Sequence, residues 1–234
     1  MGAIDDAFHG LRRIIASGEL APGQQFPPEA QLCERLQVSR GSLREAVRML
    51  GALGVIESRH GSGTYVSALE PANIIGALSL TVELMPFDGF IELYEIRRVL
   101  EAHAASQAAG RMTDAAAEEL GGILDELELL EGEAGTELDA HFHETISRLG
   151  GNAALVTLLG VFRSRSRAYQ VFELPSEVDM KRESDHGHRA ILAALINRDP
   201  SAAAVAAASH VSLTEGWLRQ HRPVPSTREL PAAG

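Results

Sequence analysis

Apolar side chains recur at helical spacing through most of this 234-residue chain. In the first segment they lie three or four positions apart, which places them on one face of a helix that ends before Gly18. A second helix is predicted over residues 29–36, and a third from Ser39, a favourable N-cap residue, to about residue 53. The apolar residues of the first helix are Ile4, Phe8, Leu11, Ile14 and Ile15.

The pattern then changes from helical spacing to two short β-prone runs. Residues 55–57 and 64–66 lie on either side of the glycine-rich stretch HGSG. Such runs around a tight turn predict a β-hairpin. Three helices followed by a hairpin are typical of a winged helix-turn-helix, so we expect a DNA-binding domain over residues 1–68.

Helical spacing returns after a short linker at 69–72 and continues to about residue 221. The expected fold is therefore mainly α: an N-terminal winged helix-turn-helix and a C-terminal all-α antiparallel bundle of six or seven helices over 73–221. Residues 222–234, which are rich in proline, are expected to form a flexible tail. Helices are predicted near 73–85, 89–110, 114–132, 136–149, 153–172, 177–198 and 200–220.

Charge is divided unevenly along the chain. The formal net charge is −11, yet residues 1–68 contain seven arginines against seven acidic residues. The acidity therefore belongs to the C-terminal part, and any contact with DNA must come from a local basic cluster in the N-terminal part. No long apolar run or basic leader is present, so we expect a cytoplasmic protein without a membrane partner. The single Cys33 excludes an all-thiolate metal cluster.

A basic stripe lies on the third predicted helix. Arg40, Arg44 and Arg48 are four residues apart and lie on the face opposite to Leu43 and Leu50. Such a helix can place guanidinium groups in a major groove, with the hairpin on neighbouring phosphates. A solvated arginine face without a partner is the alternative interpretation.

Histidines and an aspartate recur on the inward faces of three bundle helices. Helical facing points Asp139 and His143 inward and leaves His141 outside. The same test selects His188 over its neighbour His186, and it places His210 on an apolar stripe. Three imidazoles and one carboxylate suit a divalent transition metal, zinc first and nickel, manganese or iron(II) otherwise. The alternative is that each is a separately hydrogen-bonded core residue.

Arg97 falls on an apolar stripe formed by Leu93, Ile96, Leu100 and Ala104. A guanidinium inside a bundle needs an anion, which could be the carboxylate of a ligand. The alternative is a surface ion pair with Glu101, one helical turn away.

The N-terminal run SGELAPGQQFPPEAQLCERLQVSRGSLREAVRMLGALGVIESRHGSGTYV resembles the DNA-binding domain of GntR-family bacterial transcription regulators. The resemblance implies that Arg40 and Arg44 contact the bases or phosphates of a double-stranded operator. It further implies that Ser39 and Ser42 hold phosphates and that His60 and Gly61 form the tip of the wing. Ala30 departs from the family, which usually has a DNA-contacting arginine there, and this departure puts one operator contact in doubt.

Residues 74–220 resemble the FCD effector domain of the FadR subfamily. The resemblance implies that Asp139, His143, His188 and His210 are metal ligands and that Arg97 reaches a small organic acid. Asn152 is implied to cap a helix and to approach that ligand. The implied protein is a homodimeric regulator, by default a repressor. The matching stretches are LYEIRRVLEAHAA, LDAHFHETISRLGGNAAL, DHGHRAILAALINRD and ASHVSL.

Two other functions remain open for such a ligand set. In a pure metal sensor the ion itself would be the signal. A metal-dependent hydrolase or lyase would use the ion to activate water. The second alternative is weaker because no further inward carboxylate is evident as a general base, and because a DNA-reading module would be idle in such an enzyme.

Overall fold

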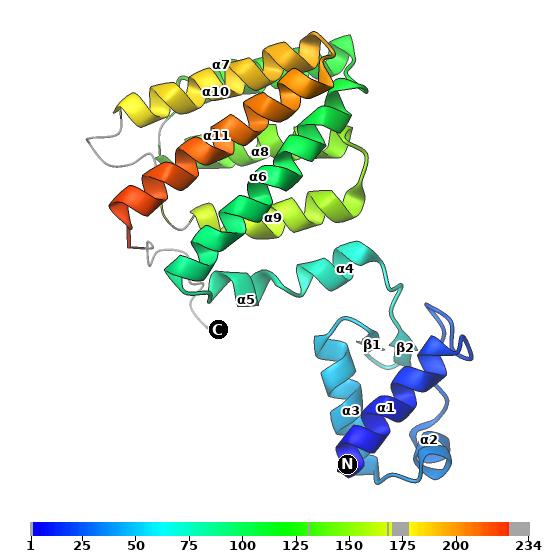
Figure 1. The fold of residues 1–234 in the computed structure, drawn as a ribbon. Helices are drawn as coiled ribbons and strands as arrows, with labels where there is room; N and C mark the ends of the chain where they lie inside the picture. Colours follow the sequence, from blue (N-terminus) through cyan, green and yellow to red (C-terminus); the bar gives the residue numbers. More distant parts are fainter. Residues whose placement is uncertain (1, 131, 168, 170–177, 225–234) are drawn as a thin grey trace. The chain divides into compact units, whose positions relative to one another are not determined.

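A computed structural model describes residues 2–130, 132–167, 169 and 178–224 (Figure 1). Its elements are mainly helices, with one two-stranded sheet. Contacts divide the chain into two compact units, Met1–Ala77 and Leu78–Gly234. Among the described residues, no helix is both long enough and apolar enough to cross a membrane.

The first unit is a winged helix-turn-helix. Its three helices are followed by an antiparallel hairpin in which Ile56 pairs with Val66. Leu11, Leu43 and Leu50 are among the apolar side chains that form its buried core. The predicted order of three helices and a hairpin is therefore confirmed. The elements are α1 (Ala3–Ala16), α2 (Glu29–Leu36), α3 (Arg40–Ala52), β1 (Ile56–Arg59), β2 (Gly63–Val66) and α4 (Pro71–Gly76).

The turn between α2 and α3 depends on two local features. Gln37 ends α2 in the left-handed backbone region, at φ 53°. Ser39 then starts α3, because its hydroxyl accepts a hydrogen bond from the backbone N–H of Ser42 at 3.0 Å. These features determine the direction in which α3 leaves the turn.

The second unit is a helical bundle. Helix α6 lies side by side with α11 (Figure 1), and it also contacts α8, α9 and α10. Thr113 and Asp199 cap α7 and α11 with side-chain oxygens that accept backbone N–H groups. The helices are α5 (Ser79–Glu83), α6 (Phe87–Ala109), α7 (Asp114–Leu127), α8 (Gly132–Leu149), α9 (Ala153–Arg167), α10 (Val178–Ile196) and α11 (Pro200–His221).

The single helix predicted over 73–85 is wrong. Two short helices, α4 and α5, occupy this stretch, and the boundary between the compact units falls just after Ala77. Gly76 ends α4, and glycine is among the residues least favourable to a helix interior. The predicted helix over 153–172 ends at Arg167 in α9, and part of its remainder lies outside the described residues, as does most of the predicted tail.

The buried face of α6 also differs from the predicted stripe. Ile96 was placed on that stripe, but its side chain is 49% exposed. The buried face instead contains Tyr94, Arg97 and Glu101, together with alanines towards the end of the helix. Because α6 is packed by several helices at once, polar groups on it are enclosed by neighbours that its own sequence does not reveal.

Candidate metal centre and DNA-binding surface

The arginines of α3 lie on its solvent side. Arg40, Arg44 and Arg48 are exposed, whereas Leu43 and Leu50 are buried against the rest of the first unit. Ala30 on α2 is exposed as well. Helix α3 therefore presents a basic stripe to solvent. Helix α2 does not add the exposed guanidinium that an arginine at position 30 would provide.

Two of the three stripe arginines are paired with carboxylates in the free chain. The Nε atom of Arg44 lies 3.0 Å from Oε1 of Glu29, and Arg48 pairs with Glu45 on its own helix. Because the side chain of Arg44 is 67% exposed, its ion pair is solvated and contributes little to stability. Each guanidinium also keeps N–H donors that its carboxylate does not use, and these could contact a phosphate or a base.

The tip of the hairpin consists of exposed residues. His60 and Gly61 lie between the two strands, and Gly61 has φ +71°, a conformation that L side chains rarely adopt. Beside the tip, the guanidinium of Arg59 stacks over the ring of Tyr65 at 4.4 Å and pairs with Glu57. The wing thus has a fixed turn with a cation at its base.

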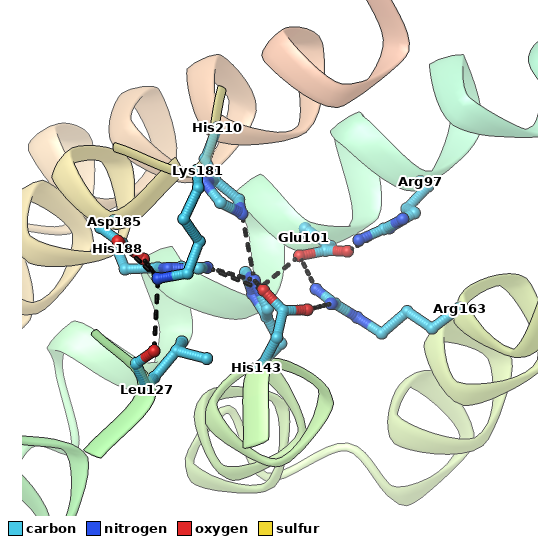
Figure 2. A network of polar contacts seen from close by, with 10 residues as sticks. Arg97, Glu101, Leu127, His143, Arg163, Lys181, Asp185, His188 and His210 are labelled. Atoms are coloured by element: carbon cyan, nitrogen blue, oxygen red, sulfur yellow. Dashed lines mark hydrogen bonds and ion pairs between the residues drawn. The ribbon is translucent and has the colours of Figure 1, made fainter. Parts of the chain in front are cut away.

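Side chains from three helices of the second unit converge on one point, where Figure 2 shows the three histidines facing one another. Asp139 and His143 come from α8, His188 from α10 and His210 from α11. One ligand-type atom of each lies within 4.8 Å of the others. The Nε2 atom of His143 is 3.2 Å from the Nε2 atoms of His188 and His210, and Nε2 of His188 is 3.1 Å from Oδ1 of Asp139.

The burial of these side chains confirms the facing predicted from helical spacing. The three histidines are buried, and the side chain of Asp139 is 23% exposed. The neighbours that were predicted to face outward, His141, Glu144 and His186, are exposed. Helical facing therefore distinguishes the histidines and the aspartate that converge from the neighbouring histidines and glutamate that face solvent.

The ionisation of the cluster suits metal binding, which requires neutral imidazoles and a charged carboxylate. Burial lowers the pKa of His143 and of His210 well below the ordinary value, and the nearby charge of Arg163 lowers both further. Burial alone would raise the pKa of Asp139, but its hydrogen bond with His188 and the positive charge of Arg163 outweigh burial and hold that pKa below its usual range.

The contacts among the three rings fit a bound cation better than hydrogen bonding alone. The Nδ1 atom of His143 lies 3.4 Å from Oε2 of Glu101, which favours a proton on that nitrogen and leaves Nε2 with only a lone pair. His188 then has one Nε2 proton at most to share between His143 and Asp139. Nitrogens bound to a tetrahedral ion lie about 3.3 Å apart, close to the 3.2 Å separations seen here. The four residues thus form a site that could hold a metal ion.

A second layer of charged groups lies beside the cluster. Glu101 on α6 accepts from Nε of Arg97 at 2.5 Å and also pairs with Arg163 of α9, while facing His143. The ion pair of Arg97 with Glu101 is therefore buried, and the alternative of a surface pair is wrong. A carboxylate that accepts from a ligand histidine typically orients the ring.

Neither Glu101 nor Arg163 was predicted as a site residue. Helical spacing suggested Glu101 only as a surface partner of Arg97, one turn away. Arg163 follows buried Leu159 by four residues, so the facing test that selected the histidines also places this arginine inward. A charged residue on the apolar face of α9 was therefore a detectable signal.

Asn152 lies at the start of α9. Its Oδ1 atom accepts a hydrogen bond from the backbone N–H of Leu155 at 3.1 Å, which confirms the predicted cap. The residue is exposed, unlike the buried histidines. Its approach to a ligand stays a prediction.

Comparisons with known proteins agree with this architecture. A model of bacterial regulatory proteins of the gntR family matches residues 3–66, and a model of the FCD domain matches residues 92–213. A solved structure of Streptococcus agalactiae GntR superimposes with a TM-score of 0.56 and 28% identity, over 91% of this chain and 99% of that chain.

Curated relatives carry the names of transcription regulators. The Uxu operon transcriptional regulator of Escherichia coli is 32% identical over 86% of this chain and 80% of its own length. The regulator LutR of Bacillus subtilis is 36% identical over 62% of this chain and 67% of its own, and a putative L-lactate dehydrogenase operon regulatory protein of E. coli is 28% identical over 92% and 86%. The relatives therefore give no support to an enzyme. The chain belongs to the gntR family of bacterial regulatory proteins, with an FCD domain after its winged helix-turn-helix.

Proposed function

We propose that this protein is a homodimeric repressor that reads a roughly palindromic operator and releases it when a small organic acid binds to the second unit. The observation that carries the proposal is the convergence of three histidine Nε2 atoms and one carboxylate, beside a buried arginine, in the second unit of a DNA-binding protein. Such a regulator would act in the cytoplasm, where the bacterial chromosome lies.

In this proposal Asp139, His143, His188 and His210 hold a divalent ion, zinc first because three imidazoles and one carboxylate are borderline ligands. The ion supplies a Lewis-acid position for a carboxylate oxygen. Arg97 is buried beside Glu101, which faces His143, and its guanidinium has N–H donors beyond those used by Glu101 and Ser166 that could bind a carboxylate. A relative is named as the putative regulator of an L-lactate dehydrogenase operon, which supports a small organic acid as the effector class without fixing its number of carboxylates.

The DNA side of the proposal rests on α3 and the wing. Arg40 and Arg44 would contact bases or phosphates, Ser39 and Ser42 would hold phosphates, and His60 with Gly61 would reach the adjacent backbone. An effector can change operator affinity only by binding differently to the DNA-compatible state and its alternative. We expect the acid to favour the state that does not bind DNA.

The test is a titration of operator affinity under three conditions. Fluorescence anisotropy with a labelled operator would be measured for the metal-free chain, the chain with zinc, and the chain with zinc plus a panel of small acids. We expect affinity to fall only in the third condition. A full response to zinc alone would replace the acid-sensing proposal with the pure metal sensor.

Arg44→Ala provides the matching test of the DNA surface. We expect this variant to lose sequence-specific operator binding in every condition and to keep its metal, because Arg44 belongs to the first unit and the metal cluster to the second. Arg13→Ala, an exposed arginine on α1, is the control for loss of one positive charge. Specific binding retained by Arg44→Ala would show that α3 is not the recognition helix.

A further inference from the structure

The charged groups around the cluster do not balance once a divalent ion is added. The charges that contact one another there are Arg97, Arg163, Glu101 and Asp139, whose sum is zero, and the neighbouring pair of Lys181 with Asp185 adds no net charge. The histidines add nothing when they are neutral ligands. A divalent ion therefore leaves two positive charges in a region shielded from water, where unbalanced charge is costly.

Arg163 has hydrogen-bonding capacity that its present partners do not use. Its side chain is only 7% exposed, and its Nε atom is buried without a hydrogen-bond partner. Its NH2 group pairs with Glu101, while NH1 lies 3.9 Å from Oδ2 of Asp139, beyond hydrogen-bonding distance. A buried guanidinium normally satisfies its donors, so the free donor indicates that an acceptor belongs here.

The two guanidinium groups approach the same carboxylate. Figure 2 shows Arg97 and Arg163 both directed at Glu101, on the side away from His188. Arg97 also donates to the hydroxyl of Ser166 at 3.1 Å, and that hydroxyl accepts from Tyr94 at 2.9 Å. Arg97 is thus held in place by neighbours from α6 and α9, and Arg163 links the same carboxylate, Glu101, to the surroundings of Asp139.

The electrostatics of Arg163 favour an additional anion. Its side chain is 7% exposed, and it shares the single carboxylate Glu101 with the equally buried Arg97. A buried guanidinium next to a like charge gains more from a new negative partner than an exposed one does.

We propose that Arg163, together with Arg97, forms the second half of the effector site and that the effector is a small dicarboxylate. One carboxylate would complete the metal site held by Asp139 and the three histidines, and the other would bind the two guanidinium groups. The dianion cancels both surplus positive charges, which a monocarboxylate cannot do. This inference rests on the proposed function and narrows it to a class of ligand.

The experiment compares two matched series of acids by calorimetry on the full zinc-loaded chain. The dicarboxylates run from malonate to adipate, and the monocarboxylates of equal carbon number run from propionate to hexanoate. We expect the best dicarboxylate to bind about tenfold to a hundredfold more tightly than its monocarboxylate match, the ratio given by one added charge-assisted contact. Zinc content is measured after each titration, so that chelation by the acid is detected.

Variants assign the preference to Arg163. In Arg163→Met the affinity for the dicarboxylate should fall close to the affinity for its monocarboxylate match. Arg163→Lys keeps the charge and protects the fold, and it should retain only part of the preference for the dicarboxylate. Arg148→Met removes an exposed arginine of α8 and should leave the preference unchanged. Equal binding of both series, or a preference that Arg163→Lys leaves intact, overturns the dicarboxylate site but leaves an acid-sensing regulator. If no acid of either series binds to the zinc-loaded chain, the proposed function fails as well.

Discussion

Histidines buried without charge are the main residue-scale feature of the second unit. His143 and His210 have pKa values well below the ordinary range because burial disfavours the imidazolium form. Each can therefore offer a lone pair at neutral pH without first losing a proton. Burial in the protein, and not the pH of the solution, therefore keeps these imidazoles in the neutral form that a cation requires.

His143→Ala should abolish stoichiometric zinc binding, because it removes the imidazole whose Nε2 atom contacts both other histidines. His141→Ala is the matched control: it lies two residues away on the same helix and is exposed. Elemental analysis of both purified variants measures the difference. Equal loss of zinc in the two would refute the assignment of the ligands by helical facing.

The metal-free protein should lose stability as the pH falls below about 6.5, the ordinary pKa of histidine. Below that pH the unfolded chain binds protons at His143 and His210, whereas the folded chain does not because its pKa values are lowered. Stability is thus fully present above this window and decreases within it by up to about 1.4 kcal/mol per pH unit for each histidine. Urea unfolding at pH 7.5 and pH 5.5 measures the change.

Exposed His186 gives the control for this pH dependence. His186→Gln should leave the difference between the two pH values unchanged, and the double variant His143→Gln, His210→Gln should reduce it. A pH dependence that is the same in both variants would show that other groups cause the acid sensitivity.

At this scale the sequence revealed the four converging residues but not the charges behind them. Facing along one helix selected Asp139, His143, His188 and His210, because each shares a stripe with apolar neighbours. Glu101 was underestimated for a physical reason: it is enclosed by α8 and α9, and no single helix shows which other helices cover it. Packing of the neighbouring helices therefore buries the pair of Arg97 with Glu101, which looks like a surface ion pair when α6 is considered alone.

At the scale of the element, a glycine of α10 leaves room for the imidazole of His210 on α11. A Cβ atom added to Gly187 would lie 2.8 Å from Nδ1 of His210, too close for the imidazole to keep its position. The absence of a side chain at position 187 therefore allows His210 to take the orientation in which it faces the other two histidines.

Gly187→Ala should weaken zinc binding by about tenfold or more, the scale seen when groups that orient metal ligands are disturbed. Competition with a chromophoric chelator measures the affinity. Gly216→Ala on α11, where an added Cβ meets nothing within 4 Å, is the control. It should keep zinc affinity and gain up to about 1 kcal/mol in the free energy of unfolding. Unchanged zinc affinity in Gly187→Ala would show that the contact is not needed.

The order and type of most elements follow from hydrophobic spacing, as the first unit shows from α1 to β2. The errors occur where spacing carries less information. The stretch that contains Gly76 appeared continuous because apolar residues lie on both sides of the break. The predicted buried stripe through Ile96 was wrong because α6 carries apolar residues on its exposed side as well as on its buried side. Periodicity alone therefore does not identify its buried face.

At the scale of the whole molecule, each unit has a hydrophobic core of its own. The only tryptophan of the chain, Trp217, lies on α11, the helix that contributes His210. Its fluorescence therefore reports unfolding of the second unit, while circular dichroism reports both units.

Zinc should raise the melting temperature followed by Trp217 fluorescence and leave the transition of the first unit in place. A ligand that binds only the folded state stabilises it by about 2.7 kcal/mol at one hundred times its dissociation constant. The measurement is a pair of thermal scans, by fluorescence and by circular dichroism, with and without zinc. A shift of both transitions by the same amount would contradict independent unfolding of the two units.

The ion pairs of α3 have a consequence for how this protein searches a genome. Non-specific attraction to DNA comes from counterions released by unpaired cations. Arg44 and Arg48 already have the carboxylates of Glu29 and Glu45 as partners, and residues 1–68 have no net positive charge. At a random site the phosphates therefore compete with these carboxylates for the two arginines, and the non-specific attraction of the first unit is expected to be weak. An operator adds base contacts to the phosphate contacts, so weak non-specific attraction widens the ratio between operator and random-site affinity.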